Sequence, residues 1–230
     1  MRLPPRRRAL LAVLASAALP WRGPGAAPRN PLWTLQDAQL RPGDLLFRRT
    51  VSLDGFGVHA IDAAGRFSHV GLVVGHAADG CAWVVHACPP ERAGQAGVRY
   101  TQARSFVGGH DVLDAAAARL RARASQRQDM VEWARARVGW GFNDRFAWHA
   151  AHALYCTQLV DGAMRAAGIT PLPIPRRWDT PLGELQVIPM SSVLNLPQLH
   201  MLPAVCHETA VPSLVPGGCA HGKAGDPILS

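Results

Sequence analysis

Short apolar runs, bounded by turn residues, mark the first half of the chain and predict β-strands. Five such runs are found, over residues 45–47, 68–75, 82–87, 98–101 and 111–113. Within 68–75 the side chains alternate between two faces, so Val70 and Leu72 share one face while His69 and Gly71 share the other. The first half of the chain therefore predicts a small sheet of short strands.

Helical periodicity is confined to the second half of the chain. Ser125, followed three residues later by Gln128, predicts a capped helix that ends near Gly139. A second amphipathic pattern with a period of 3.6 residues runs over 156–167 and stops at Gly168. Strands followed by helices predict an α+β fold, in which a small, mostly antiparallel sheet packs against the helix that begins at Cys156.

The two ends of the chain differ in composition from its middle. Four arginines among the first eight residues precede an apolar run over 9–19, which is shorter than the roughly 20 residues needed to span a bilayer. We interpret 1–27 as an export signal, 28–40 as a linker, 41–200 as the folded domain and 201–230 as a poorly ordered tail. An uncleaved membrane anchor and a twin-arginine signal remain alternatives for the N-terminus.

Removing the signal changes the charge of the protein. The chain has a formal net charge of +8, and residues 1–27 contain five arginines and no acid, so 8 − 5 leaves +3 for the remainder. That remainder has no cluster of basic residues interleaved with aromatics. We therefore expect no nucleic-acid partner and, once the signal is removed, no stable membrane span.

The cysteines give little support to a metal centre. The chain has five, at positions 81, 88, 156, 206 and 219, so at least one thiol is unpaired in an exported protein. Neither a CxxC pair nor a four-ligand zinc spacing is present, and His149 and His152 would need a third ligand. We expect neither a metal nor a cofactor. Cys206 and Cys219 are candidates for pairing with each other, although spacing alone does not fix connectivity.

Three residues could perform covalent catalysis. Cys156 lies at a predicted helix N-terminus, where free N–H groups and the helix dipole favour a thiolate and a developing oxyanion. His69, on a strand beside Gly71, is suited to proton transfer near neutral pH. His86, in the next apolar strand, needs a polar partner and could orient His69. Each also has a plain alternative: a buried packing thiol, or a structural histidine bonded to backbone or water.

Four segments together resemble a known family. They are GDLLF (43–47), SHVGLVVG (68–75), VVHA (84–87) and YCTQLV (155–160). The first three are similar to strand motifs of the NlpC-type cysteine peptidases, and a cysteine motif that comes last is similar to the circularly permuted, YiiX/YebB-like papain-fold hydrolases. The resemblance implies a permuted papain-like fold, with Cys156 as nucleophile, His69 as general base and His86 as the residue that orients it.

The resemblance also suggests residues that contact substrate. Tyr155 precedes the nucleophile, Asp44 opens the first motif, and Gln158 stands where the permuted group tends to have an acid. These three are our substrate-binding candidates, although Asp44 is equally suited to shaping its turn and Tyr155 to packing. The third catalytic position is often a carboxylate in YiiX-like members, whereas this chain has His86.

The expected reaction is hydrolysis of amide, or ester, bonds through a thioester. The resemblance implies amide substrates in cell-envelope peptides or in N-acyl amino acids and lipids, and the predicted export signal implies a periplasmic or extracellular enzyme. One alternative is a thiol acyltransferase similar to lecithin–retinol acyltransferase, because VVHACPPE (84–91) resembles its second histidine motif. Another is an envelope binding protein that has lost activity. The sequence does not indicate an oligomeric state.

Overall fold

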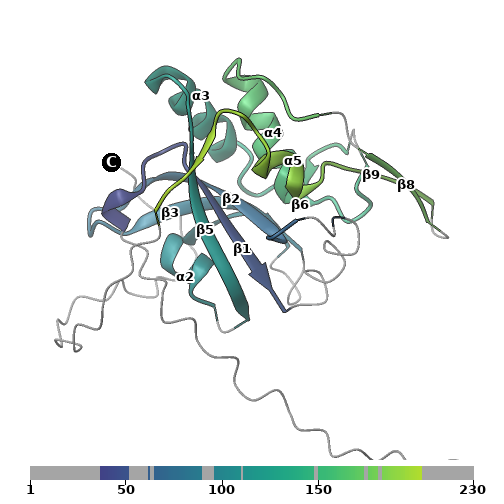
Figure 1. The fold of residues 1–230 in the computed structure, drawn as a ribbon, viewed down its shortest axis with the longest axis horizontal. Coiled ribbons are helices and arrows are strands. Elements are labelled where there is room, and N and C mark those ends of the chain that lie inside the picture. The colour runs from purple at the N-terminus through teal and green to yellow at the C-terminus, as the bar shows by residue number, and fades with distance from the viewer. Residues whose placement is uncertain are drawn as a thin grey trace, which may run out of the picture.

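The protein is seen in a computed structural model that describes residues 37–51, 62, 65–89, 96–109, 111–147, 150–173, 176–180 and 183–203. Its centre is a six-stranded antiparallel sheet with the strand order β10-β5-β1-β2-β3-β4 (Figure 1). The strands are β1 (Leu45–Thr50), β2 (His69–His76), β3 (Ala82–Cys88), β4 (Gly97–Gln102), β5 (Val112–Leu120) and β10 (Leu199–Met201). The predicted α+β class is confirmed.

Helices and two small sheets surround this sheet. The helices are η2 (Asp37–Gln39), α2 (Ala103–Val107), α3 (Ala124–Arg135), α4 (Cys156–Ala166) and α5 (Met190–Leu194). One small sheet pairs β6 (Gly141–Phe142) with β7 (Ala153–Leu154) in parallel, and the other pairs β8 (Arg176–Thr180) with β9 (Gly183–Val187) as an antiparallel hairpin. Figure 1 shows this hairpin extending away from the main sheet, beyond α5.

Each face of the main sheet has its own core. The larger core joins Val70, Leu72 and Val74 of β2 to the buried sides of α3 and α4. The smaller core joins Val73 of β2 to Phe106 of α2. This division follows from strand alternation, because successive side chains of β2 point to opposite faces. The predicted two-faced character of this strand is confirmed.

Two predicted elements are wrong in extent. The strand predicted over 111–113 continues to Leu120, because its alanines are buried between β1 and β10 and tertiary pairing overrides the helical preference of alanine. The cap of α3 is not the Ser125–Gln128 pair. Instead Gln126 accepts a hydrogen bond from the N–H of Arg123 at 3.1 Å, and the helix ends at Arg135. In contrast, α4 begins and ends within one residue of its predicted bounds.

The structure describes only parts of the segments that the sequence analysis assigned to the two ends of the chain. Leu40, in the predicted linker, is buried in the α2-side core, and β10 reaches Met201 at the start of the predicted tail. The predicted signal and the candidate Cys206–Cys219 pair lie outside the described residues. No helix within the described ranges is long and apolar enough to cross a membrane.

Candidate active site

Cys156 is the first residue of α4. Tyr155 precedes it in an extended conformation as N-cap, and its N–H donates to the side-chain Oε1 of Gln158 at 3.2 Å. The Cys156 thiol is free and only 9 % exposed. The first backbone N–H groups of a helix lack partners within the helix, so the start of α4 offers donors for a developing negative charge beside the sulfur.

A segment far along the chain fixes the start of α4. The Tyr155 hydroxyl accepts from the N–H of Ile188 at 3.0 Å and donates to the carbonyl of Gln186 at 3.2 Å. The Thr157 hydroxyl donates to the carbonyl of Ile188 at 2.9 Å. These bonds are shielded from solvent because Tyr155, Thr157 and Ile188 are buried. The residues on both sides of Cys156 are therefore held by the end of β9 and the residue that follows it.

Burial governs the ionisation of the thiol. It raises the pKa of Cys156 to about 11, against the lowering effects of the N–H groups of Val70, Thr157 and Cys156 itself and of the charge on Arg48. The thiol is thus protonated at neutral pH and needs a base before it can attack. The Val70 N–H that acts on this thiol belongs to the residue that follows His69 in β2.

His69 and His86 form a buried imidazole pair. Nε2 of His69 lies 2.8 Å from Nδ1 of His86, with the rings at 80° to one another. Nε2 of His86 lies 2.9 Å from Oγ1 of Thr101 on β4. A neutral imidazole has two polar nitrogens. The pair therefore leaves Nδ1 of His69 as the nitrogen available to a reacting group, since among the described residues no hydrogen bond engages it.

Both imidazoles are neutral at physiological pH. Burial lowers the pKa of His69 well below 6.5, and the charges of Arg48, of His86 when it is protonated, and of Arg99 lower it further. Burial likewise lowers the pKa of His86, followed by the charges of Arg48 and Arg99. A histidine must be neutral to accept a proton. The site therefore holds a protonated thiol and an uncharged base rather than a resting ion pair.

Phe106 of α2 packs against both rings of the pair. Its ring centre lies 5.5 Å from that of His69 in a tilted contact, and 5.2 Å from that of His86 in an edge contact. The guanidinium carbon of Arg48 lies 4.8 Å from the centre of the Phe106 ring, and its Nη1 donates to the Phe106 carbonyl at 3.3 Å. Phe106 therefore packs against both imidazoles and also contacts a cation.

Gly71 makes this packing possible. A Cβ built on Gly71 would lie 2.4 Å from Cγ1 of Val84, 3.2 Å from Cβ of His86 and 3.3 Å from Cε2 of Phe106. The space over Gly71 is filled by side chains of β3 and α2.

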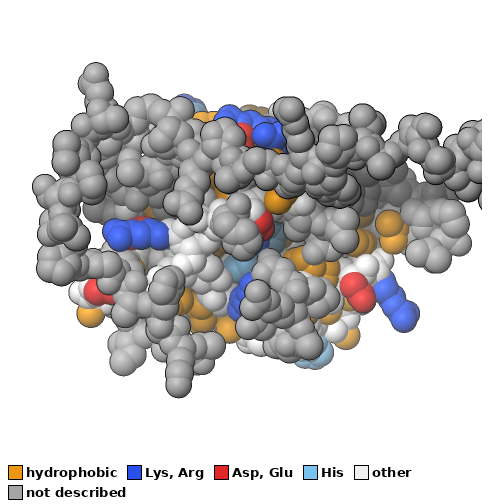
Figure 2. Space-filling model, turned by 90° about the horizontal axis from the view of Figure 1, so that it is seen from below, with side chains coloured by type: hydrophobic (Ala, Val, Ile, Leu, Met, Phe, Trp, Pro, Cys, Tyr) orange, Lys and Arg blue, Asp and Glu red, His pale blue; other side chains and the backbone are white. Residues whose placement is uncertain are grey.

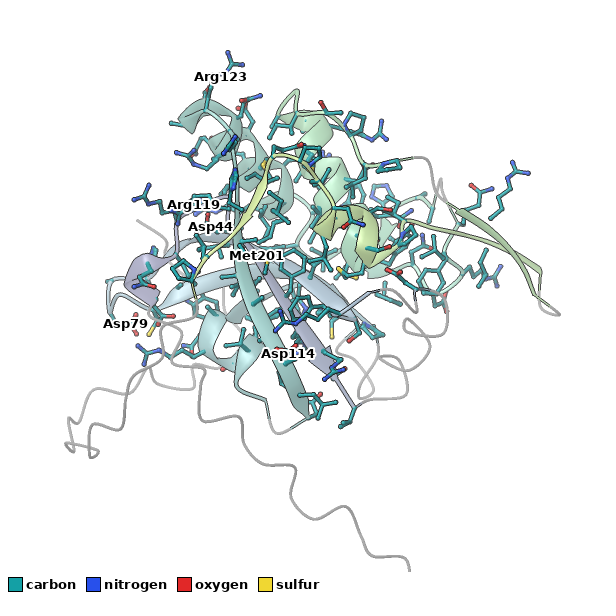
Figure 3. All side chains as sticks on the ribbon, in the orientation of Figure 1. Asp44, Asp79, Asp114, Arg119, Arg123 and Met201 are labelled. Atoms are coloured by element: carbon teal, nitrogen blue, oxygen red, sulfur yellow. The ribbon has the colours of Figure 1, made fainter. Side chains whose placement is uncertain are left out.

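Two of the three substrate-binding candidates, Asp44 and Gln158, make contacts within the protein. Asp44 is fully buried in the turn before β1, where it pairs with Arg119 at 2.7 Å (Figure 3). Asp44 directly precedes β1, four residues before Arg48, the residue that pairs with His69. Gln158 accepts from Nδ2 of Asn143 at 2.9 Å and donates to the Ala147 carbonyl at 3.2 Å. These contacts leave little of either side chain to meet a substrate.

Sequence reasoning missed Thr101, Phe106 and Arg48. Thr101 and Phe106 lie on β4 and α2, which directly follow one another, and Arg48 lies opposite His69 on β1. A sequence signal existed only for Thr101, which would share a face with the histidines once the predicted strand 98–101 was placed beside 82–87. Figure 2 shows histidine and basic side chains next to one another near the centre of one face.

The described residues contain no group of three His, Cys, Asp or Glu side chains arranged to hold a metal ion. Cys88 is fully buried in β3, and Nη2 of Arg99 donates to its sulfur at 3.2 Å. Cys81 is disulfide-bonded. Of the cysteines that the structure describes, Cys156 is the one that lies at a helix start.

Comparisons with known proteins agree with this fold. A family model described as "Permuted papain-like amidase enzyme, YaeF/YiiX, C92 family" matches residues 39–172. A crystal structure titled as that of metalloprotein YiiX from Escherichia coli O157:H7 is similar, with a TM-score of 0.55 and 18 % identity, over 72 % of this chain and 98 % of that one. At this identity the likeness shows the fold alone. No curated protein matches the chain.

Proposed function

The chain belongs to the permuted papain-like amidases of the YaeF/YiiX type, the C92 family of cysteine hydrolases, and from that premise we propose that Cys156 is its nucleophile and His69 its general base. His86 orients His69. The observation that carries the proposal is the 2.8 Å contact between the two imidazoles, which reserves Nδ1 of His69 for the reaction. The free thiol at the start of α4, beside the Val70 N–H, supplies the nucleophile.

The reaction is an acyl transfer through a thioester. His69 Nδ1 takes the thiol proton as the sulfur of Cys156 bonds to the amide carbonyl carbon. N–H groups at the start of α4 stabilise the oxyanion. The tetrahedral intermediate expels the amine, which receives the proton from His69. His69 then deprotonates a water molecule, which attacks the thioester carbon. The acid is released, and the Cys156 sulfur that leaves takes the proton back from His69. Because thiol and imidazole are both neutral at rest, proton transfer accompanies attack.

The proposed substrates are amides of the cell envelope, either peptides or N-acyl amino acids and lipids. Peptides and N-acyl amino acids carry carboxylates close to the scissile amide. The positive charges of Arg48 and Arg99 act at the imidazole pair, where they lower both pKa values. Such a positive potential favours a substrate with an anionic group near the reacting carbon.

We place the enzyme outside the inner membrane. Two features support this location: the basic head and apolar run within residues 1–27, and the disulfide at Cys81. Disulfides persist in oxidising compartments such as the periplasm and are rare in the cytosol. Fractionation of cells expressing the full chain, together with N-terminal sequencing of the mature protein, tests both the location and the cleavage site.

The test of function compares three proteins on one substrate panel. Wild type, Cys156→Ala and Cys88→Ala are incubated with envelope peptides and N-acyl amino acids, and products are identified by mass. We expect hydrolysis by wild type and Cys88→Ala and none by Cys156→Ala. Hydrolysis by Cys156→Ala would disprove the assigned nucleophile.

A second arm addresses the acyltransferase alternative. An alcohol or amine acceptor is added in competition with water. A hydrolase releases the free acid in either case, whereas a transferase yields the acylated acceptor. Wild type that turns over no member of the panel, and whose native Cys156 resists a thiol-reactive probe that labels the unfolded chain, would indicate a binding protein instead.

A further inference from the structure

The hydrogen-bond chain of the imidazole pair ends on a residue of β4. His69, His86 and Thr101 form an unbroken sequence of contacts, at 2.8 Å between the imidazoles and 2.9 Å from His86 Nε2 to Thr101 Oγ1. We propose that Thr101 is a positioning residue, whose hydroxyl accepts the His86 N–H and thereby holds both imidazoles in the tautomers that let His69 act as a base. This inference rests on the proposed function of His69.

The argument begins at the atom that must receive the thiol proton. A neutral imidazole has one N–H and one lone pair. If Nδ1 of His69 is to accept a proton, that nitrogen has the lone pair and Nε2 has the hydrogen. The Nε2–H of His69 then donates to Nδ1 of His86, so this nitrogen must have its lone pair free to accept the hydrogen bond. The hydrogen of His86 is consequently on Nε2, and the atom it faces is Thr101 Oγ1.

The same acceptor is required after the proton has moved. When His69 becomes an imidazolium, its Nε2–H still donates to His86, and His86 still donates to Thr101. If the extra proton shifts to Nδ1 of His86, the Nε2–H of His86 again faces Thr101. A hydroxyl oxygen has lone pairs for this role. Thr101 thus supports the base before, during and after transfer, whereas an apolar residue would support none of these states.

Removing the hydroxyl reverses the tautomers. His86 is 1 % exposed, so an Nε2–H left without an acceptor would bear the cost of a buried unpaired donor. The pair avoids that cost by moving the hydrogen of His86 to Nδ1, which forces the hydrogen of His69 onto Nδ1 as well. His69 then presents an N–H to the thiol and cannot accept its proton.

Because the surrounding side chains hold both imidazole rings in place, loss of the Thr101 hydroxyl should change which nitrogens have the hydrogens and should not move the rings. Phe106 contacts both imidazoles, at 5.5 Å from His69 and 5.2 Å from His86 between ring centres. Thr101 and Phe106 belong to the continuous β4–α2 segment. One stretch of chain therefore supplies both the hydrogen-bond acceptor and the aromatic ring that packs against the two imidazoles. Threonine and valine have nearly the same shape, so Thr101→Val removes the hydroxyl with little change in packing.

The test compares Thr101→Val with Thr101→Ser in the full chain. Valine is expected to lower kcat by about 10- to 100-fold with KM nearly unchanged, because a wrong tautomer impairs proton transfer rather than binding. Serine keeps the hydroxyl and is expected to restore kcat to within about threefold of wild type. Thr101→Val with wild-type kcat, or an equal loss in both variants, would overturn the inference.

A spectroscopic arm is independent of activity. Nitrogen-15 NMR of the histidine side chains reports which ring nitrogen has the hydrogen, and it can be recorded on Cys156→Ala proteins without any substrate. His69 is expected to be protonated at Nε2 with Thr101 present and at Nδ1 with valine. If the tautomer is unchanged by valine, Thr101 has no positioning role, even if Cys156 and His69 prove essential. If the tautomer changes in an enzyme without amidase activity, the inference stands and the proposed function fails.

Discussion

Arg48 lies directly opposite His69 in the β1–β2 ladder. Side chains paired in this way share one face of the sheet, so the guanidinium and the imidazole both lie on the side covered by α2. The charge of Arg48 lowers the pKa of His69, after the larger effect of burial. The strand register thus keeps the proposed base uncharged.

Replacing Arg48 should move the acid limit of activity. Activity is lost when His69 is protonated, as the pH falls through its pKa, which lies below 6.5. Arg48→Met removes a positive charge and raises that pKa, so the acid limb of kcat/KM should shift to higher pH. It should remain below 6.5, because burial persists. Arg48→Lys keeps the charge and should leave the limb in place. If the acid limb of the kcat/KM profile moves equally in both variants, or in neither, the charge of Arg48 does not set the pKa of His69.

Adding one methyl group at Gly71 should disturb the imidazole pair. The new Cβ would collide with Val84 at 2.4 Å and crowd His86 and Phe106. Gly71→Ala should lower the free energy of unfolding by about 1–3 kcal/mol, measured in urea, and reduce kcat. Adding Val84→Ala removes the closest contact and should recover part of both losses. If the double variant is no better than the sum of the single ones, the collision is not the cause.

The side chain of Gln158 should matter for the helix start rather than for substrate affinity. Gln158→Leu leaves the N–H of Tyr155 and the amide of Asn143 without their acceptor. The expected cost is about 2 kcal/mol of stability, with a lower kcat as Cys156 shifts. Gln158→Glu retains an acceptor and adds a negative charge at the helix N-terminus, so it should keep most activity. A change in KM without a change in stability would instead indicate contact with substrate.

Breaking the Asp44–Arg119 pair should destabilise the protein without changing its kinetics. Asp44 is fully buried, and its two carboxylate oxygens accept from Nε and Nη2 of Arg119 and from the N–H of Arg41. Arg119→Met leaves a buried charge that has lost its counterion, at a cost of about 3 kcal/mol in urea unfolding. At temperatures where the variant is folded, kcat/KM should match wild type. A raised KM would place Asp44 near the substrate.

The elements that could be predicted from the sequence are those with a clear hydrophobic periodicity within one short segment. The alternation in 68–75 and the apolar period after Cys156 were enough to locate β2 and α4 and to separate the two faces of β2. These patterns arise from burial on one side, which any single sequence records. The same patterns led to His69, His86 and Cys156 as candidates.

Features that depend on contacts between residues far apart in the chain could not be predicted from the sequence. The length of β5 is set by pairing with β1 and β10, and its alanines alone do not indicate a strand. Hairpin β8–β9 and strand β10 lie in a stretch where proline is frequent and periodicity fades. Thr101 meets His86 only because β4 pairs with β3, so its position in the proposed site required the register.

The contacts of Tyr155 and Thr157 with residues 186–188 have a practical consequence for domain dissection. The family model ends at residue 172, before the chain that receives these bonds. A fragment cut at that limit would contain Cys156, His69 and His86, yet two buried hydroxyls flanking the sulfur would lose their partners. The shortest autonomous enzyme should therefore extend through Met201, and proteolytic nicking near the β8–β9 hairpin should inactivate it while sparing the histidines.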